Sequence, residues 1–435
     1  MKLDHDQLAQ RLESALGADA VKLQPSALSS HAVDGKQPGL VCSPGTPDQI
    51  AAALRVCSEA EASVAPWGGG TAIRVGNPPR RVDVVIELSR MNRLIEHDDA
   101  NLTATVEAGM TLADVQQSAA RSKQFLALDP PFPTRATVGG IIATNLNGPR
   151  RSCYGSVRDL VIGMKVVLAT GDQIKAGGKV VKNVAGYDMC KLFVGSLGTL
   201  GIMTEATLRM APTPESAATW IASGTLPQAL QFADELSHSQ LLPAAVFLLR
   251  RQALEASDGA RRAWQVAVWT EGFEETVARH FRDLQAMAAR MNLNTEILRD
   301  NVHDQFWNEI RDFPLQSDRL VYRITAPRGS VTELVKAVEA WEPAELVPAI
   351  VGDMAMGTVW IASTANNESA EKFSRLVSLA REHRGHVVML AAPPDLKEGV
   401  DVWGSPPPTL SIMREIKQQF DPKGLLNPGR FVGGI

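Results

Sequence analysis

The stretch best suited to chemistry is a run of glycines, and between Pro66 and Gly76 the chain reads PWGGGTAIRVG. Three consecutive glycines remove every β-carbon from the backbone, so successive N–H groups can turn inward as a concave nest with partial positive charge. Thr71 adds a hydroxyl donor with little bulk. We therefore predict an anion site, best suited to a diphosphate, that needs no Lys or Arg. For the glycine run alone, a flexible surface turn is the alternative.

The segments beside this loop favour the anion site. Residues 62–65 and 82–88 are apolar runs typical of short strands, so the glycines join two pieces of sheet. A Rossmann dinucleotide fingerprint is excluded because it requires G-x-G-x-x-G opening into a helix, whereas Pro78 and Pro79 follow here. A nucleoside triphosphate loop is excluded because its Lys-Ser/Thr pair is missing.

Two further glycine-rich segments follow, ATVGGIIATNLNG at 136–148 and GSLGTLGI at 195–202. The first combines small residues with amide side chains, where a ligand with many acceptors can lie flat; taken alone, it also fits a tightly packed helix start. The second directly precedes a predicted strand. Three such segments in one region favour a single large ligand over coincidence.

Predicted helices and strands position these glycine-rich segments. A helix begins at Thr46-Pro47-Asp48-Gln49, which has the pattern of a capping box with proline at the first helical position. Residues 102–106 alternate as a half-buried strand does, and another helix opens at Thr111. A long apolar strand then runs to Leu168, with Gly171-Asp172 as its hairpin turn.

Length and composition limit the classes of protein. A chain of 435 residues that is 45% hydrophobic is too long for one core, so two domains are expected. A net charge of -4 with scattered basic residues disfavours nucleic acid and anionic membrane as partners. The polar start and the lack of an eighteen-residue apolar run predict a soluble cytoplasmic protein without a transmembrane segment. No metal site is predicted, since the four cysteines are far apart: Cys42, Cys57, Cys153 and Cys190.

The order of the motifs carries a specific resemblance. P-x-G-G-G-T at Pro66, T-V-G-G at Thr137, Y-G-x-x-R-D-L-V at Tyr154 and G-T-L-G-I at Gly198 resemble the FAD-binding domain of the vanillyl-alcohol oxidase and cresol methylhydroxylase (PCMH-type) superfamily. The resemblance implies an extended FAD, its diphosphate on the first loop and its isoalloxazine ring at the junction with a cap domain. The residues implied to bind FAD are Pro66, Trp67, Gly68, Gly69, Gly70, Thr71, Ala72, Gly76, Thr137, Gly139, Gly140, Asn145, Gly148, Gly155, Gly198, Gly201 and Ile202.

The mode of FAD attachment follows from one position. Members of this superfamily that hold FAD covalently often do so through a His at the third glycine position of the first loop. That position is Gly70 here. The resemblance therefore implies a non-covalent FAD.

The second half of the chain resembles the family's cap domain. Beyond Pro214, glycine becomes rarer and two successive strand–helix–strand–strand–helix–strand series are predicted, joined by a helix near 301–311. The segment 413–430 resembles the terminal segment of the glycolate, D-lactate and D-2-hydroxyglutarate oxidising flavoenzymes, in which it returns to the FAD domain. We expect an α+β fold, a PCMH-type two-subdomain FAD-binding fold with an inserted α+β cap of two ferredoxin-like units. The expected divisions are a helical lead-in (1–36), the FAD-binding domain (37–213), the cap (214–402) and the returning segment (403–435).

Two motifs of the oxidising relatives are missing. Their metal-binding G-H-x-G-D-G-N-x-H corresponds to VGDMAMGTVW at 351–360, and their G-E-H-G-I-G, which carries a base, corresponds to LAAPPDLK at 390–397. Neither segment contains a His. The catalytic residues are therefore unknown, and the weak candidate is Arg311, after Trp307, which resembles a carboxylate-binding Trp-x-x-Arg with one extra residue. A surface salt bridge is the alternative role for Arg311.

The combination of retained flavin motifs and lost metal and base motifs resembles the FAD-binding subunits of multi-subunit glycolate oxidases. It implies a role in electron transfer or assembly beside a catalytic flavoprotein and an iron–sulfur subunit in a complex that converts glycolate to glyoxylate. Association with the inner face of a membrane would then come through these partners. Two alternatives stay open: a self-sufficient FAD-dependent 2-hydroxy-acid or alcohol dehydrogenase, and a non-redox scaffold that binds a phosphate ligand.

Overall fold

The structure is a computed structural model, which describes residues 3–178, 188–250, 263–316, 319–341 and 349–435. It divides into two compact units. Unit 1 contains Met1–Asn147, Ser156–Pro212 and Lys397–Ile435, and unit 2 contains Gly148–Gly155 and Thr213–Leu396. The chain thus enters unit 2 twice, first for eight residues that the sequence analysis assigned to the FAD-binding domain.

Unit 1 holds two main sheets. The first has the order β1-β2-β4-β3, with β2, β4 and β3 parallel, and the second is antiparallel with the order β5-β6-β10-β8-β9. The strands are β1 (Val21–Lys22), β2 (Leu40–Cys42), β3 (Val64–Trp67), β4 (Val84–Glu87), β5 (Leu94–Asp98), β6 (Thr103–Glu107), β8 (Val161–Val167), β9 (Gln173–Gly177) and β10 (Ile202–Arg209), with a small pair of β7 (Gln124–Phe125) and β11 (Ala211–Pro212).

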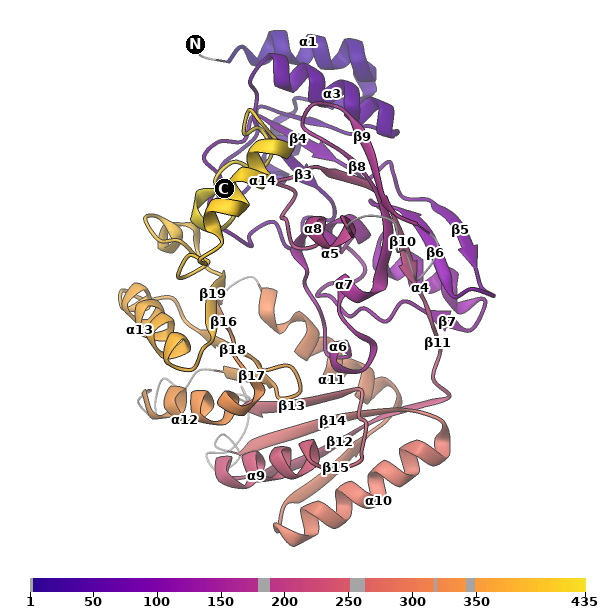
Figure 1. Ribbon diagram of the computed structural model, residues 1–435, viewed down its shortest axis with the longest axis vertical. Coiled ribbons are helices and arrows are strands. Elements are labelled where there is room, and N and C mark those ends of the chain that lie inside the picture. Colours follow the sequence, from indigo (N-terminus) through magenta and orange to yellow (C-terminus); the bar gives the residue numbers. More distant parts are fainter. Residues whose placement is uncertain (1–2, 179–187, 251–262, 317–318, 342–348) are drawn as a thin grey trace. The chain divides into compact units, whose positions relative to one another are not determined.

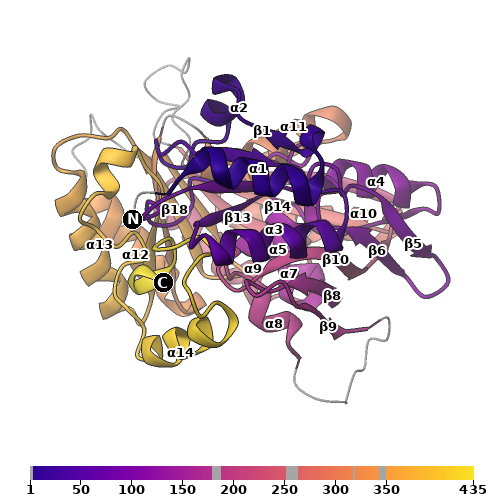
Figure 2. The same ribbon diagram turned by 90° about the horizontal axis from the view of Figure 1, so that it is seen from above.

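Two helices of unit 1 begin where the sequence signals them. Thr46 and Thr111 each accept the N–H of the residue three positions on, so each caps its helix, and Pro47 is the first residue after the Thr46 cap. Helices α1 and α3 pack against each other (Figure 2). The helices are α1 (His5–Leu16), η1 (Ala18–Ala20), α2 (Pro25–Ser30), α3 (Pro47–Glu59), α4 (Leu112–Ala120), α5 (Val138–Thr144), α7 (Val157–Leu160), α8 (Cys190–Phe193), α14 (Leu410–Phe420) and η6 (Val432–Gly434).

Two local expectations need correction. The apolar strand ending near Leu168 begins only at Val161, because Ser156 and Asp159 form a capping box around the single-turn helix α7. The N-terminal lead-in is also more than helical. Its strand β1 pairs with β2 and so extends the first sheet.

Unit 2 is built on one eight-stranded sheet with the order β15-β12-β14-β13-β17-β18-β16-β19. Each half follows a strand–helix–strand–strand–helix–strand path, and its strands lie in the spatial order fourth, first, third, second, which is the ferredoxin-like arrangement. The predicted pair of ferredoxin-like units is therefore confirmed. The strands are β12 (Ser216–Gly224), β13 (Ala245–Arg250), β14 (Trp264–Gly272), β15 (Asn294–Leu298), β16 (Leu320–Thr325), β17 (Ala349–Asp353), β18 (Thr358–Ser363) and β19 (His386–Ala391).

Different helices pack on the two faces of this sheet. Helices α9 and α10 pack on the first half and α12 and α13 on the second, whereas α6 and α11 lie on the other side of the strands (Figure 1). Phe306, Trp307 and Ile310 of α11 join the buried core there, with Trp269 and Phe247. The helices are α6 (Arg151–Tyr154), α9 (Leu226–Ser237), α10 (Glu274–Arg290), α11 (Asp300–Asp312), η3 (Phe313–Leu315), η4 (Arg328–Ser330), α12 (Val331–Trp341), α13 (Ser369–Glu382) and η5 (Pro394–Lys397), which ends in unit 1.

Candidate FAD-binding site

The first glycine loop leaves the end of β3 with its amide groups unused. Leu88 donates its N–H to the carbonyl of Trp67, which ends the β3–β4 ladder. Beyond Trp67, none of the described residues accepts a hydrogen bond from the N–H groups of residues 68–71. Four successive amides without a protein acceptor form a donor set that fits the phosphate oxygens of a cofactor diphosphate.

The glycines of this loop also permit close packing of protein on protein. A β-carbon at Gly69 would lie 1.6 Å from the carbonyl oxygen of Arg135, and one at Gly68 would lie 2.1 Å from Oγ1 of Thr137. Gly70 has a φ of +68°, the left-handed region that favours glycine. From the sequence, the missing side chains are expected to make room for a ligand. At positions 68 and 69 the structure corrects that reason, because atoms of Thr137 and Arg135 occupy the space.

The second glycine-rich segment contains the start of α5, as expected from the alternative prediction of a tightly packed helix start. Thr137 accepts the N–H of Gly140 at 3.3 Å and caps the helix, and Gly139 donates to the carbonyl of Ala108 at 2.7 Å. The amide of Gly139 is therefore engaged by protein. Gly140 has more free space, since a β-carbon there would meet only Oγ1 of Thr137, at 3.2 Å. Asn145 ends α5 in the left-handed conformation.

The third segment closes against the other two. Gly195 and Leu197 donate to the carbonyls of Ile142 and Ala143 in α5. Gly198 has a φ of +67°, and a β-carbon there would lie 3.2 Å from Cγ of Pro66. Unit 1 thus brings together segments that are more than a hundred residues apart in the chain.

Other predicted residues lie elsewhere. Ile202 begins β10 opposite Val167, and a β-carbon at Gly201 would lie 2.5 Å from Cγ1 of Val166, so both positions fit the packing of β10 on β8. Gly148 and Gly155 belong to unit 2. Their predicted contacts with FAD stay predictions, as do those of the other FAD-binding residues.

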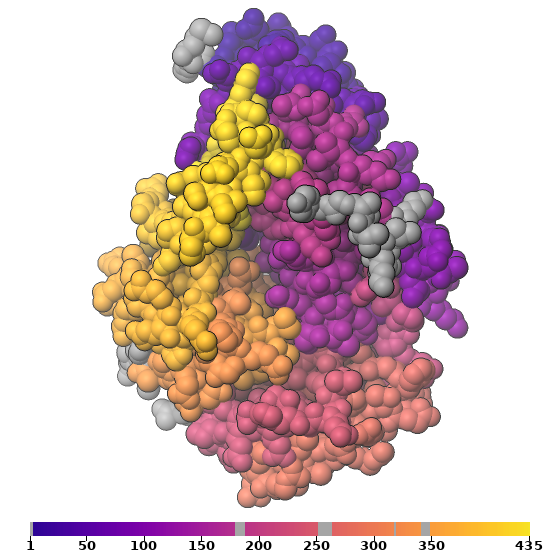
Figure 3. Space-filling model, in the orientation of Figure 1, coloured from indigo at the N-terminus to yellow at the C-terminus, as the bar shows by residue number. Residues whose placement is uncertain are grey.

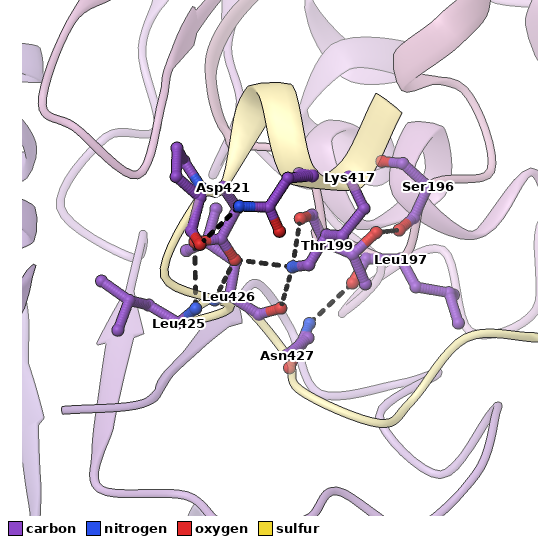
Figure 4. Close-up of polar contacts among 10 residues, drawn as sticks. Ser196, Leu197, Thr199, Lys417, Asp421, Leu425, Leu426 and Asn427 are labelled. Atoms are coloured by element: carbon purple, nitrogen blue, oxygen red, sulfur yellow. Dashed lines mark hydrogen bonds and ion pairs between the residues drawn. The ribbon is translucent and has the colours of Figure 1, made fainter. Parts of the chain in front are cut away.

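The C-terminal segment holds the third glycine segment in place. Figure 3 shows this segment, in yellow, against magenta residues of unit 1. Lys417 of α14 donates to the carbonyl oxygens of Thr199 at 2.8 Å and Leu426 at 2.9 Å and pairs with Asp421 at 2.6 Å (Figure 4). Asn427 donates to the carbonyl of Leu197 at 2.6 Å.

The same segment holds the first loop through two buried cations, Lys397 and Arg430, which we call the C-terminal brace. Lys397 pairs with Asp34 at 3.0 Å and donates to the carbonyls of Arg74 and Gly76. Arg430 donates to the carbonyls of Ile73 and Val75. Four successive carbonyl oxygens of the loop therefore accept from cations, so the loop conformation depends on residues far along the chain. Burial lowers the pKa of Arg430 to about 10, and Arg430 stays charged at neutral pH.

Unit 2 contains a buried polar cluster that no sequence motif indicated. The carboxylate of Glu271 lies 3.7 Å from the guanidinium of Arg150, and Tyr154 forms a hydrogen bond with Glu271. Burial, then this hydrogen bond, raises the pKa of the Tyr154 phenol, which keeps it neutral. Arg150 also stacks over the ring of Trp269 at 4.9 Å. Tyr154 begins the Y-G-x-x-R-D motif and Arg150 lies shortly before it, so both stand near a recognisable local signal. Their partner Glu271 lies on β14, far away in sequence, and the motif does not reveal it.

Arg311 is partly buried and engaged with its neighbour, because its Nε donates to the carboxylate of Asp312 at 3.1 Å. That contact fits the alternative hypothesis that Arg311 forms a salt bridge. In the part of the chain that the structure describes, no group of three or more His, Cys, Asp or Glu is arranged to hold a metal ion. Asp353, in the segment that corresponds to the relatives' metal motif, accepts the N–H groups of Ala355 and Met356 at 3.1 Å each.

Comparisons with known proteins identify FAD-binding relatives of this chain. The model of the FAD binding domain family matches residues 38–177, and that of the C-terminal domain of FAD linked oxidases matches residues 405–431. The glycolate oxidase subunit GlcE of Escherichia coli is 30% identical over 78% of this chain and 84% of its own. The glycolate oxidase subunit GlcD of Bacillus subtilis is 29% identical over 90% of this chain and 88% of its own.

Solved structures show the same fold. The structure of p-cresol methylhydroxylase with substrate bound superimposes with a TM-score of 0.76 and 16% identity, over 99% of this chain and 97% of its own. At this identity the likeness concerns the fold alone. None of the described helices is long and apolar enough to cross a membrane.

Proposed function

The chain belongs to the family of FAD-linked oxidases, and from that premise we propose that it is the non-covalent FAD-binding subunit of a multi-subunit glycolate oxidase. FAD is its cofactor. When bound, FAD accepts two electrons from a substrate and passes them on singly or together. The subunit would support electron transfer or assembly beside a catalytic flavoprotein and an iron–sulfur subunit.

The free amides of residues 68–71 support the placement of the FAD diphosphate on the first loop. The C-terminal brace supports this placement too. Lys397 and Arg430 hold the carbonyl groups of residues 73–76, so these oxygens cannot turn toward the diphosphate, which they would repel. Gly70 supports non-covalent attachment, since a His in its place would need a φ of +68° and a β-carbon 2.7 Å from Cζ2 of Trp67.

One observation carries the subunit role: the segment 351–360 contains no His, and its single carboxylate is turned onto its own backbone. Asp353 is buried, and one of its oxygens accepts from both Ala355 and Met356. A lone carboxylate held by its own backbone in this way is a poor ligand for a hard cation, because no His or second carboxylate in the segment can join it. Similarity to GlcE over most of its length points the same way.

The test compares three preparations with glycolate and a dye acceptor: this chain alone, the candidate catalytic flavoprotein alone, and the two co-expressed with the iron–sulfur protein. We expect negligible turnover by this chain alone and full turnover only in the complex. Co-purification at fixed stoichiometry would support the assignment. Robust turnover by the isolated chain would overturn it.

A self-sufficient 2-hydroxy-acid dehydrogenase is the second candidate. The buried set of Arg150, Tyr154 and Glu271 favours it, because a carboxylate between a cation and a phenol is a possible proton-transfer group. Anaerobic mixing of the holoprotein with a panel of hydroxy acids decides between the candidates. If a hydroxy acid bleaches the flavin of the wild type but not that of Glu271→Gln, the self-sufficient dehydrogenase is favoured.

A further inference from the structure

One face of the unit 2 sheet carries an arginine without a counter-charge. Tyr322 of β16 points to α13, where its hydroxyl donates to the carbonyl of Ser369 and its ring stacks on Phe373. Side chains alternate along a strand, so Arg323 points to the opposite face, the one that α11 covers. Its cross-strand partner on that face is Trp360. Nε of Arg323 is buried, and no atom among the described residues accepts a hydrogen bond from it.

The eight residues at 148–155 bring a second arginine to this face. Oγ of Ser152 donates to the carbonyl of Ala244 at 3.0 Å, directly before β13, and Arg150 stacks over Trp269. Ala244 and Trp269 both belong to the core on the α11 side of the sheet. Helix α6 is therefore held over that face, and it carries Arg151, whose Nε is likewise buried without a described acceptor.

The charges of these two arginines influence each other. Burial, and then the charge of Arg151, lowers the pKa of Arg323 to about 10. One acid on the same face is Asp353, which lies opposite Phe247 of β13 and is influenced by the charge of Arg151. Burial raises its pKa to about 7, although Arg151 and Arg328 oppose the rise, so at neutral pH it supplies only part of a negative charge. Neither arginine forms an ion pair with an acid among the described residues.

Two neighbouring guanidinium groups that are partly buried and lack a carboxylate are costly unless an anion joins them. We propose that Arg151 and Arg323 bind a small carboxylate anion on this face of unit 2. A planar carboxylate matches the fork of a guanidinium, and two forks can hold both of its oxygens. The proposal deepens the proposed function and rests on it, since it gives the chain a site for the carboxylate of a 2-hydroxy acid or of its 2-oxo product. Binding there requires no turnover.

The test is calorimetric titration of the FAD-loaded full chain at constant ionic strength, with sodium glycolate and sodium oxalate as carboxylates and inorganic phosphate as the comparison anion. We expect saturable carboxylate binding that weakens about 10- to 100-fold in Arg151→Met and in Arg323→Met, because each substitution removes a charge-assisted pair. Arg323→Lys, which keeps the charge but loses the fork, should retain part of the affinity. Arg279→Met is the matched control, since Arg279 lies exposed on α10 beside Asp283.

Each outcome bears on one claim. Flavin-loaded protein that binds no carboxylate, or binds it equally well after both Met substitutions, would overturn the anion site. Phosphate binding as tight as carboxylate binding would overturn the choice of ligand. The visible flavin spectrum of the same samples separates the claims, because protein that cannot be loaded with FAD would contradict the proposed function instead. If Arg323→Met does not fold, Arg151→Met on the short helix α6 carries the test.

Discussion

Replacing Arg430 with Met should weaken both the fold of unit 1 and its binding of FAD. Arg430 is 2% exposed and donates to the carbonyls of Ile73 and Val75 in the first glycine loop. Each unmade hydrogen bond to a buried partner costs about 1–3 kcal/mol. Part of that cost is offset, because Nε and Nη1 of Arg430 are buried without a described partner and Met removes this penalty. We expect a net loss of about 1–4 kcal/mol in the free energy of unfolding.

The effect on FAD follows from the order of the loop. Without Arg430, the two carbonyls are free to turn, and the amides of residues 68–71 must be ordered again when FAD binds. About 1.4–2.8 kcal/mol of ordering free energy corresponds to a 10- to 100-fold rise in the FAD dissociation constant. Flavin fluorescence titration of the apoprotein measures that constant. Arg430→Lys should lie between the wild type and Arg430→Met.

Two controls separate positioning from general stability. Leu12→Ala removes a buried side chain from α1 and should destabilise unit 1 by about 2–5 kcal/mol without changing FAD affinity. Arg414→Met removes an exposed contact with the carbonyl of Gly433 and should change neither quantity. If Arg430→Met and Leu12→Ala weaken FAD binding equally, the brace has no special role in positioning the loop and the reasoning fails.

Three further changes test other parts of the structure. Gly69→Ala places a β-carbon 1.6 Å from the carbonyl of Arg135 and should yield protein with little bound flavin, as read from its visible absorbance; flavin-replete protein would contradict the packing. Asp353 has a pKa raised to about 7 by burial, so its cost to folding is absent below the unfolded pKa near 4 and grows as pH rises toward 7. Asp353→Asn should therefore raise the free energy of unfolding by up to about 4 kcal/mol at pH 8 and hardly at all at pH 4, in urea titrations at both values; equal effects at the two pH values would refute this. Acid precipitation should leave a colourless pellet and a yellow supernatant, whereas a yellow pellet would show covalent flavin.

Local signals predicted most of the fold. The caps at Thr46 and Thr111 act through contacts within four residues, so the sequence alone locates both helix starts. The ferredoxin-like arrangement also follows from local order, because two strand–helix–strand–strand–helix–strand series permit few other compact sheets. The helix at Val157 is not predicted from the apolar run beyond it, which matches a strand, although the Ser156–Asp159 capping box is a local signal for a helix start.

The site was less predictable because its supports act over long sequence separations. Lys397 and Asp34 are 363 residues apart, and a single lysine after Pro-Pro-Asp-Leu has no local pattern that indicates a buried partner. The reason for Gly69 likewise lies in Arg135, which the glycine run itself does not reveal. Arg151 and Arg323 become neighbours only through the crossing of the chain at 148–155 into unit 2.

The C-terminal brace also constrains the order in which the protein can mature. Residues Lys397–Ile435 leave the ribosome after all of unit 2, yet Leu425 and Asn427 pair with Val64 and the brace fixes residues 73–76. Domains usually fold as they are synthesised, from the N-terminus onward. Here the nascent flavin domain stays incomplete until residues Lys397–Ile435 have also been synthesised. Cofactor capture should therefore follow the synthesis of unit 2, and a stop codon at Lys397 should yield an apoprotein.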